Sequence, residues 1–269
     1  MTGKASTAAF DSKTRVAEKL TRVKHKIAVL SGKGGVGKST VAANIALALA
    51  GKFKEKVGLI DADIHGPNIP KILGVEDKQP EIGPEGVFPV RGPKNLKIVS
   101  MAFFLKTKDT PVIWRGPMKM KALEQFLTDF VWGELEWLVV DLPPGTGDEP
   151  LSIMQLIPDV TGAIIVTTPQ EVSILDTGKA ISMMKQMNIP VLGVIENMSC
   201  FVCSSCGTKH PIYGEGGGQK LADHFGIPLL AQIPFDPNIR IKEDSGISEA
   251  FEPFSKIAGA LVKKVNGEN

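Results

Sequence analysis

Cysteine, tyrosine and aromatic residues in general are scarce in this sequence. Its 269 residues include three cysteines and one tyrosine, and aromatic residues make up 6%. Three cysteines within residues 200–206 cannot build a paired disulfide framework, which excludes a disulfide-stapled secreted domain and indicates a reducing compartment. No apolar run approaches the ~18 residues that span a bilayer, and residues 1–10 lack the apolar core of a secretory signal. We therefore expect a cytoplasmic protein that does not act in a membrane.

The sequence also lacks an excess of charge of either sign. Thirty-one Lys and Arg residues against 29 Asp and Glu residues give a formal net charge of +2, which is too small to attract nucleic acid over the whole surface. A hydrophobic fraction of 43% excludes intrinsic disorder. The 28 glycines and 19 prolines suit many tight turns between buried elements. We expect a globular α/β protein without a nucleic-acid partner.

Hydrophobic patterning divides the chain into a basic arm and one folded domain. Residues 1–24 are polar and contain four Lys and two Arg, which predicts a flexible N-terminal arm or a short helix before the folded body, and residues 25–269 are expected to form a single domain. Short apolar runs predict buried strands at Ile27–Leu30, Val57–Ile60, Leu96–Val99, Trp137–Val140, Ala163–Val166, Val191–Ile195 and Leu229–Ile233. Helical periodicity predicts helices at Ser39–Ala50, Met118–Phe130, Ile174–Met187, Gly218–Phe225 and Phe254–Val265.

The alternation of these elements predicts the fold class. Near-continuous apolar strands separated by helices are typical of a parallel sheet that is covered on both faces. We therefore predict a doubly wound, mostly parallel α/β sheet with helices on both faces. Residues 76–95 contain four prolines and three glycines, which favours a small hairpin or an excursion on the ligand face over a long regular element.

A glycine-rich motif predicts a phosphate-binding loop between the first strand and the first helix. Residues 32–39 match the P-loop pattern of Gly, four residues and Gly-Lys-Ser/Thr. The glycines let backbone N–H groups surround phosphate oxygens, and the helix N-terminus adds a partial positive charge. We expect Lys38 to bridge the β- and γ-phosphates of ATP and the Ser39 hydroxyl to bind Mg²⁺. The predicted nucleotide-binding residues are Gly32, Lys33, Gly34, Gly35, Val36, Gly37, Lys38, Ser39 and Thr40.

Three aspartates follow predicted strands at the edge of the sheet where the P-loop lies. Asp141 follows Trp-Leu-Val-Val, and Asp61 and Asp63 follow Val-Gly-Leu-Ile. Ligands of open α/β sheets bind at the carboxyl ends of the strands. Asp61 and Asp141 are therefore candidate ligands of Mg²⁺, and Asp63 is a candidate for orienting the attacking water. The alternative is that these side chains cap the turns that follow them.

Together, the motifs resemble those of the Mrp/NBP35 (ApbC-type) P-loop ATPases, which are scaffold and carrier proteins for iron–sulfur clusters. That family lies within the deviant Walker A group, with MinD, ParA and the nitrogenase iron protein. The likeness runs from about Lys24 to Val262. It rests on Ser-Gly-Lys-Gly-Gly-Val-Gly-Lys-Ser-Thr at 31–40, Asp-Ala-Asp-Ile-His-Gly-Pro-Asn-Ile-Pro at 61–70, Trp-Arg-Gly-Pro-Met at 114–118, Asp-Leu-Pro-Pro-Gly-Thr-Gly-Asp at 141–148, Thr-Thr-Pro-Gln-Glu at 167–171 and Glu-Asn-Met-Ser at 196–199.

This resemblance implies a homodimer that binds and slowly hydrolyses ATP, carries an iron–sulfur cluster and transfers it to apoproteins. Lys33 would be the signature lysine that reaches the partner chain's nucleotide, with an ordinary loop lysine as the alternative. Lys33, Lys38 and Asp63 would be the catalytic residues, and Asp63 would position the hydrolytic water. Asn197 would contact the adenine, and the loop at Pro234 would close over the base.

The cysteines form a C-x2-C-x2-C pattern of Cys200, Cys203 and Cys206. A two-residue turn brings both thiolates of a CxxC to one side, where they can bind a metal ion or cluster. One CxxC supplies half of a four-thiolate shell, which two facing loops of a homodimer would complete, and in the family Cys203 and Cys206 would hold a bridging [4Fe–4S] cluster. Cys200 departs from the family pattern: it is a spare thiol, a third ligand within one chain, or part of a Zn²⁺ knuckle with His210. A redox disulfide is a further interpretation of the CxxC.

A second function class is a MinD/ParA-like positioning ATPase. Residues 254–265 place apolar side chains at helical spacing with Lys256, Lys263 and Lys264 nearby, as a membrane-surface helix does. Docking of this helix on the sheet is the simpler interpretation. A P-loop kinase or ligase ranks last because no acceptor-substrate motif accompanies the P-loop. The cysteine cluster favours the carrier, since a positioning ATPase does not need it.

Overall fold

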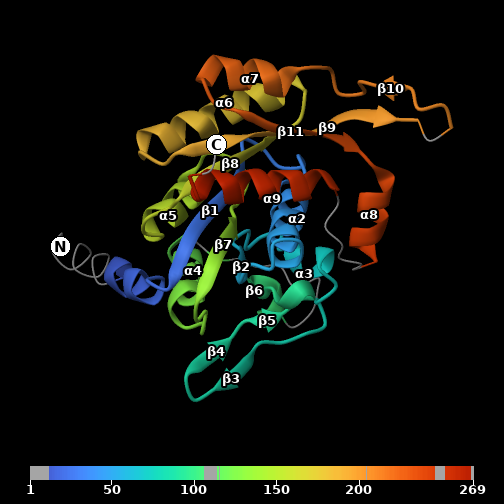
Figure 1. Cartoon of the computed structure of the whole chain (residues 1–269). Helices are drawn as coiled ribbons and strands as arrows, with labels where there is room; N and C mark the ends of the chain where they lie inside the picture. Colours follow the sequence, from blue (N-terminus) through green and yellow to red (C-terminus); the bar gives the residue numbers. More distant parts are fainter. Residues whose placement is uncertain (1–11, 106–113, 115, 204, 246–251, 268–269) are drawn as a thin grey trace.

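The computed structural model describes residues 12–105, 114, 116–203, 205–245 and 252–267. The strands are β1 (Val23–Ser31), β2 (Val57–Asp61), β3 (Glu81–Gly83), β4 (Gly86–Phe88), β5 (Val90–Arg91), β6 (Lys97–Ser100), β7 (Leu135–Asp141), β8 (Gly162–Thr167), β9 (Val191–Val202), β10 (Lys209–His210) and β11 (Leu229–Phe235). In the described residues, a nine-stranded sheet has the order β10-β9-β8-β1-β7-β2-β6-β5, and β11 also pairs with β9 (Figure 1). All its pairings are parallel except those of β10 and β5.

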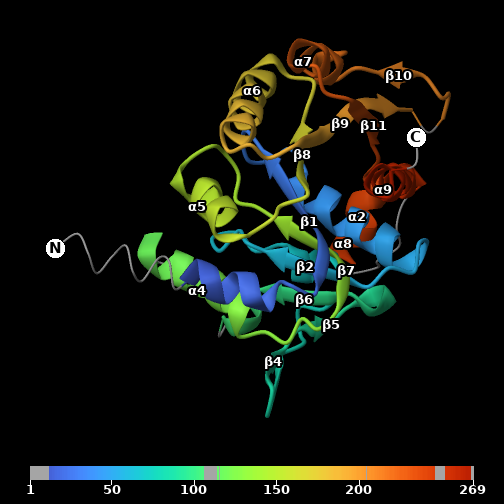
Figure 2. The same cartoon turned by 60° about the vertical axis from the view of Figure 1, so that its left-hand side comes forward.

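Helices cover both faces of this sheet. They are α2 (Lys38–Gly51), α3 (Ile69–Ile72), α4 (Gly116–Thr128), α5 (Asp148–Leu156), α6 (Glu171–Gln186), α7 (Gly217–Phe225), α8 (Pro237–Asp244) and α9 (Glu252–Val265), with 3₁₀ turns at Pro93–Asn95 and Met101–Phe104. Figure 2 shows α4, α5 and α6 on one side of the sheet and α2 and α9 on the other. The doubly wound α/β fold predicted from the sequence is confirmed.

The central strands are buried on both faces, which explains their continuous apolar runs. In β7, Trp137 and Val139 belong to the core layer of α2 and α9, whereas Leu138 and Val140 belong to the layer of α4, α5 and α6. All four are at most 3% exposed. Successive side chains of a strand point to opposite faces, so a strand that is covered on both sides needs apolar residues at every position.

Every predicted strand and helix is present, with shifted ends. The helices α3, α5 and α8 were not predicted from the sequence. Residues 76–95 contain the hairpin of β3 and β4, which projects from the body of the molecule (Figure 1). The helix α5 begins with Asp-Glu-Pro, and in the sequence these residues resemble a continuation of the preceding loop. Acidic residues and proline are nevertheless favourable in the first turn of a helix.

Of the two alternatives for residues 1–24, the described residues form the short helix and not the flexible arm. Residues 12–19 are helical, and Val16 and Leu20 are at most 1% exposed, in the core layer that contains α4. The strand β1 then begins at Val23, before the predicted domain boundary. Val16 and Leu20 are four positions apart and therefore share one helix face. They stand among basic residues, which made this apolar pair difficult to recognise in the sequence. Residues 1–11 lie outside the described residues.

The helix α9 packs on the body of the protein. Phe254, Ile257, Ala258 and Leu261 are at most 1% exposed and share a core with α2. A membrane-surface helix would need this apolar face free. Docking on the sheet is therefore confirmed, and the feature that favoured a positioning ATPase is absent. Among the described helices, none has the length and apolar character needed to cross a membrane.

Candidate functional site

The P-loop connects β1 to α2 at the carboxyl edge of the sheet. Gly35 and Gly37 have φ angles of 79° and 81°, a left-handed conformation that glycine adopts without steric cost. Gly37 is also the N-cap of α2, and no side chain caps the helix there. The N–H groups of the first helical turn are therefore directed at the loop, where a phosphate group can accept their hydrogen bonds.

Two close contacts fix the position of the loop. A Cβ atom on Gly32 would lie 2.2 Å from the backbone carbonyl carbon of Asp176 in α6, and one on Gly37 would lie 2.2 Å from Asn197 Nδ2. Asn197 Nδ2 also donates to the Val36 carbonyl at 2.9 Å. Packing against the backbone of α6 therefore requires glycine at position 32, whereas a larger residue at position 37 would displace the Asn197 amide and adopt an unfavourable positive φ. The structure brings Asn197 to the P-loop, and its contact with adenine stays a prediction.

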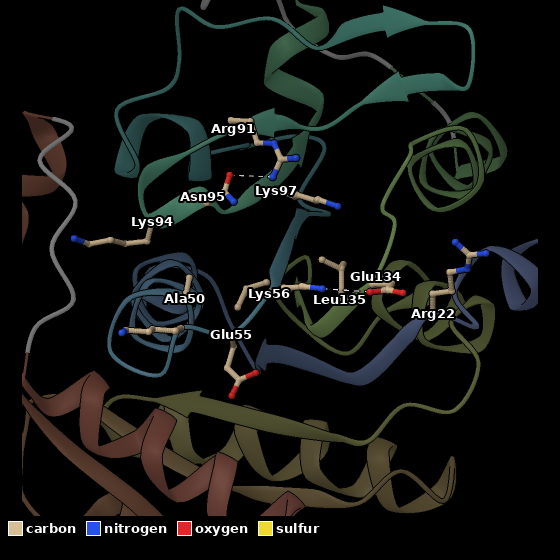
Figure 3. Close-up of a pocket in the computed structure, with 12 residues that line it drawn as sticks. Arg22, Ala50, Glu55, Lys56, Arg91, Lys94, Asn95, Lys97, Glu134 and Leu135 are labelled. Atoms are coloured by element: carbon tan, nitrogen blue, oxygen red, sulfur yellow. Dashed lines mark hydrogen bonds and ion pairs between the residues drawn. The ribbon is translucent and has the colours of Figure 1, made fainter.

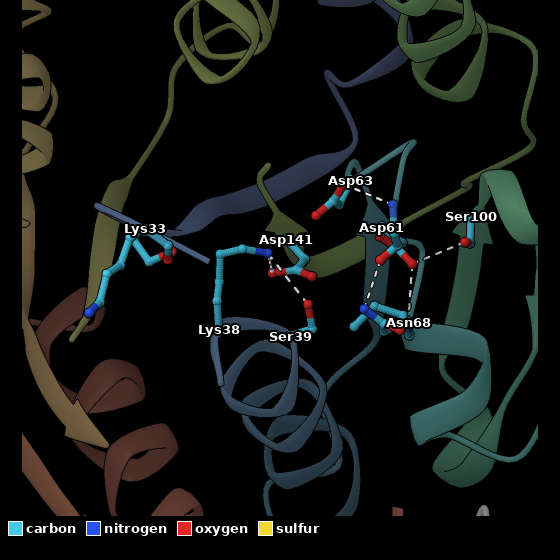
Figure 4. A network of polar contacts seen from close by, with 11 residues as sticks. Lys33, Lys38, Ser39, Asp61, Asp63, Asn68, Ser100 and Asp141 are labelled. Carbon is cyan, nitrogen blue, oxygen red and sulfur yellow. Dashed lines mark hydrogen bonds and ion pairs between the residues drawn. The ribbon is translucent and has the colours of Figure 1, made fainter. Parts of the chain in front are cut away.

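A buried ion pair joins the P-loop to the end of β7. Lys38 Nζ lies 2.6 Å from Asp141 Oδ1, and the two side chains are 6% and 0% exposed. Lys38 Nζ also donates to Ser39 Oγ at 3.4 Å. Figure 4 shows these three side chains converging between α2 and β7. Asp61 is the register partner of Asp141 on the neighbouring strand β2, so the sheet brings both predicted Mg²⁺ ligands together.

The buried carboxylates have the properties of a cation site. Asp61 Oδ2 accepts hydrogen bonds from the Ile69 N–H and the Ser100 hydroxyl, both at 3.1 Å. Asp61 Oδ1 and Asp141 Oδ2 have no hydrogen-bond partner among the described residues. Carboxylate and hydroxyl oxygens are the ligands that Mg²⁺ prefers. Asp61, Asp141 and Ser39 therefore fit a Mg²⁺ ion, which would offset the charge of nucleotide phosphates.

Burial raises the pKa of both carboxyl groups. The pKa of Asp61 is about 8 because the group is buried and because the charge of Asp141 lies beside it. Burial also raises the pKa of Asp141, against the opposing effect of the Lys38 ammonium. Two neighbouring buried carboxylates are unfavourable when both are charged. Without a metal ion, Asp61 therefore holds a proton over much of the neutral range.

The pKa of Asp61 predicts how stability depends on pH. The unfolded-state pKa of Asp is about 3.9, so between about pH 4 and 8 the folded state binds more protons than the unfolded chain. This contribution to the free energy of unfolding is complete below about pH 4 and is lost as the pH rises through about 8. In EDTA without nucleotide, we expect the melting temperature to fall between about pH 5.5 and 8, and Asp61→Asn to reduce that fall. Equal falls in both proteins would contradict the prediction.

Asp63 and Lys33 lie on opposite sides of Lys38 (Figure 4). Asp63 Oδ1 accepts a hydrogen bond from the Gly66 N–H at 3.2 Å, which is the turn-capping contact, and the residue also lines the P-loop cavity. Lys33 Nζ donates to Gln170 Oε1 at 3.1 Å and points away from Lys38. Lys33 must therefore exchange Gln170 for another acceptor before it can reach a nucleotide on a second chain.

A cavity of about 330 Å³ lies over the P-loop. It is lined by Ser31, Lys33, Gly34, Gly35, Gly37, Lys38, Ser39, Thr40, Asp63, Asn68, Lys71, Ile72, Pro144 and Glu243. The Thr40 hydroxyl donates to Glu243 of α8 at 3.0 Å, a contact that the sequence analysis missed because it predicted no helix there. Pro234 lies in β11 and lines a separate cavity with Phe201 and Asp236, so the structure does not bring Pro234 to the P-loop.

The cysteines lie on the hairpin of β9 and β10, which projects beyond the sheet (Figure 1). Cys200 is part of β9, and Cys203 and Cys206 lie in the connection to β10. The Cys203 N–H donates to the Thr208 carbonyl at 2.9 Å, and the Gly207 N–H donates to the Cys203 carbonyl at 2.8 Å. All three thiols are free, and that of Cys206 belongs to an exposed residue.

Local hydrogen bonds lower the pKa of the Cys206 thiol. The largest cause is the Thr208 hydroxyl, 3.2 Å from Cys206 Sγ, followed by the Thr208 backbone and the Cys203 thiol. A lower pKa favours the thiolate, which is the form that binds metals. In the part of the chain that the structure describes, no three His, Cys, Asp or Glu side chains are grouped to hold one metal ion. Cys200 and His210 therefore do not complete a site with the CxxC within these residues.

Lys119, which was not predicted from the sequence, connects two loops of the nucleotide site. Lys119 lies in α4 and is 7% exposed. Its ammonium contacts Glu149 Oε1 in the first turn of α5 and His65 Nε2 in the loop that contains Asp63. The motif at 114–118 ends one residue before it, and a single lysine on a helix is usually solvated. Its burial became evident from the structure.

Lys119→Met tests whether this contact supports ATP hydrolysis. We expect turnover of ATP to fall about 10-fold, or about 1.4 kcal/mol of activation free energy, because the loops at Asp63 and Glu149 lose their common cation. The affinity for ADP should change less than about twofold, since Lys119 does not line the P-loop cavity. Lys121→Met, at an exposed position of the same helix, is the control. Equal turnover in the two variants would contradict the prediction.

Comparison with known families assigns this chain to one of them. Residues 22–266 match a family model described as ParA: NUBPL iron-transfer P-loop NTPase. A protein of Methanocaldococcus jannaschii named iron–sulfur cluster carrier protein is 53% identical over 260 residues, which cover 94% of this chain and 89% of the relative. A protein of the same name from Saccharolobus solfataricus is 50% identical over 240 residues, which cover 89% of this chain and 79% of the relative.

Solved structures agree with this assignment. A nucleotide-binding protein of Archaeoglobus fulgidus, in complex with ADP, superposes with a TM-score of 0.80 at 38% identity and covers 90% of this chain and 95% of its own. The cell division ATPase MinD of Pyrococcus furiosus has a TM-score of 0.65 at 24% identity, with 90% and 100% covered, and is similar in fold alone. The resemblance drawn from the motifs is therefore confirmed. The chain is a P-loop ATPase that belongs to the NUBPL iron-transfer family of the ParA group.

Proposed function

We propose that this protein is a homodimeric carrier that binds a [4Fe–4S] cluster between the CxxC loops of its two chains and transfers it to apoproteins. Slow hydrolysis of Mg²⁺·ATP would control the dimer. The observation that carries the proposal is the pair of free thiols, half-buried Cys203 and exposed Cys206, in a P-loop ATPase. Two thiolates are half of the four that hold such a cluster. Free thiols persist in a reducing cytoplasm, where we expect the carrier to act.

An exposed apolar face beside the P-loop supports the homodimer. Val172 and Leu175, in the first turns of α6, are 64% and 69% exposed. Gln170, the N-cap of the same helix, binds Lys33. Exposed large apolar residues beside a functional site are typical of a protein interface. Burying this face against a second chain would bring each Lys33 toward the partner's nucleotide.

The strand β9 offers a physical connection between nucleotide and cluster. Asn197 contacts the P-loop at Val36, and Cys203 follows only six residues later in the chain. Between them, Met198 has a φ of 55°, a left-handed conformation that interrupts the regular strand. A shift of the P-loop on binding ATP would therefore act on Asn197 and move the thiol loop.

A charged substitution on the apolar face tests the dimer. We expect Leu175→Lys to prevent dimerisation in Mg²⁺·ATP and to lower the iron bound after anaerobic reconstitution at least about 5-fold, because an unpaired charge is costly to bury. Ile82→Lys is the matched control, since Ile82 is 86% exposed on the distant hairpin of β3 and β4. Light scattering after size exclusion gives the mass, and iron is assayed in the same fractions. Wild-type mass and iron in Leu175→Lys would overturn the proposal.

A further inference from the structure

Another cavity, of about 640 Å³, lies at the edge of the sheet opposite the P-loop (Figure 3). Lys56 immediately precedes β2, Lys97 begins β6, and Leu135 begins β7. The P-loop, Asp61 and Asp141 lie at the other ends of β1, β2 and β7. This amino-edge cavity is therefore separated from the nucleotide site by the length of the strands.

Positive charge dominates the lining of the amino-edge cavity. Its cations are Arg22, Lys54, Lys56, Arg91, Lys94 and Lys97, against two carboxylates, Glu55 and Glu134. Lys56 pairs with Glu134 at 3.2 Å, and among the described residues no other cation of the cavity has an ion pair. The chain as a whole has a formal net charge of only +2, so this local excess of cations stands out from the average surface.

Arg91 and Lys97 line the amino-edge cavity, and neither forms an ion pair with a carboxylate of the described residues. Arg91 Nη1 donates to Asn95 Oδ1 at 3.0 Å, and Lys97 Nζ donates to the Trp132 carbonyl, so both are held by neutral acceptors. The pKa of Lys97 is lowered by burial and by the charges of Arg91 and Lys56. Figure 3 shows Arg91, Asn95 and Lys97 together, with Glu55 pointing away from them. An anion in the cavity would offset the positive charges of Arg91 and Lys97.

The backbone of the cavity is conformationally strained. Lys54, Lys94 and Asn95 have φ angles of 54°, 53° and 64°, in the left-handed region that residues with a Cβ rarely adopt. Six non-glycine residues among those described have a positive φ, and three of them line this one cavity. Strained residues cluster at binding sites, where the strain positions side chains for a ligand. Here the strained residues are Lys54, in the loop before β2, and Lys94 and Asn95, in the turn before β6.

We propose that the amino-edge cavity binds a small polyanion, a compound that carries several phosphate or carboxylate groups. The volume lies within the roughly 300–1,000 Å³ of small-molecule sites. Arg91 offers a planar fork that matches phosphate and carboxylate oxygens, and the lysines add mobile ammonium groups from three other segments of the chain. This binding is independent of the P-loop, because none of the residues lining one cavity lines the other.

Equilibrium dialysis with labelled tripolyphosphate tests this proposal, in metal-free buffer with one equivalent of ADP per chain for the P-loop, because an excess of this polyanion would compete for the amino-edge cavity. We expect one tripolyphosphate per chain and at least about 10-fold weaker binding by Arg91→Gln/Lys97→Gln. Arg91→Gln alone should weaken binding measurably, and this exposed residue can be replaced without disturbing the core. Lys220→Gln/Lys263→Gln removes the same charge from exposed positions of α7 and α9, and its affinity should stay within about twofold of wild type.

Two further ligands identify the chemistry of the bound compound. Citrate in place of tripolyphosphate separates a carboxylate ligand from a phosphate ligand, and binding of either one that depends on Arg91 supports the proposal. Deca-glutamate represents an acidic segment of a protein. Binding of deca-glutamate alone, or equal loss of affinity in the two double variants, would overturn the proposal.

Discussion

Replacing Lys38 with alanine is expected to reduce ATP turnover at least about 100-fold. Lys38 is the only P-loop side chain of the described structure that forms an ion pair with the buried Asp141, at 2.6 Å, and it lines the cavity over the loop. Its ammonium is thereby fixed where the phosphates of a nucleotide would lie. Preorganised charges of this kind stabilise the transition state of phosphoryl transfer.

Loss of activity through unfolding must be separated from loss of catalysis. Lys38→Ala leaves Asp141 as a buried carboxylate without its cation, which costs about 3–5 kcal/mol of folding free energy. The double variant Lys38→Ala/Asp141→Asn removes that charge and should recover most of the melting temperature, which would identify the buried charge as the cause of the lost stability. Phosphate release at saturating Mg²⁺·ATP measures the effect. A stable double variant with turnover within about 10-fold of wild type would refute the role of Lys38.

Cys203→Ser and Cys206→Ser are each expected to abolish binding of the iron–sulfur cluster. Both cysteines lie in the connection between β9 and β10, and hydrogen bonding with Thr208 lowers the pKa of the Cys206 thiol. Serine lacks the soft thiolate that iron–sulfur clusters require. We expect less than about a tenth of the wild-type iron and sulfide after anaerobic reconstitution. The visible absorption of the cluster should disappear in parallel.

Cys200→Ser is the matched control for these two variants. Cys200 lies inside β9, and the described residues do not group it with two further metal ligands. The variant should therefore retain iron, and all three variants should bind ADP like wild type because no cysteine lines the P-loop cavity. Equal loss of iron in Cys200→Ser would make Cys200 a third ligand.

Local sequence was enough to predict the nucleotide site and the central sheet. The P-loop is a contiguous motif whose glycines are dictated by backbone geometry, as the φ angles of Gly35 and Gly37 confirm. The strands were predictable because burial on both faces leaves an unbroken apolar run, as in β7. The positions of Asp61 and Asp141 could be predicted as well, because each residue ends a parallel strand at the carboxyl edge of the sheet.

Features that depend on contacts between distant segments were not predictable. The lining of the amino-edge cavity extends from Arg22 to Leu135 without any sequence period. Gln170 lay in a motif that the analysis quoted, yet its contact with Lys33 depends on how the start of α6 packs beside the P-loop. Lys119 is buried only because two loops of the nucleotide site close over it. The sequence around a charged residue does not indicate such burial.

The most direct test of the central proposal is native mass spectrometry of the wild-type protein after anaerobic reconstitution with iron and sulfide. We predict one species that contains two chains and one [4Fe–4S] cluster, with about four irons and four sulfides per two chains in bulk analysis. A cluster bound to a single chain, or zinc bound without iron, would contradict the bridging carrier.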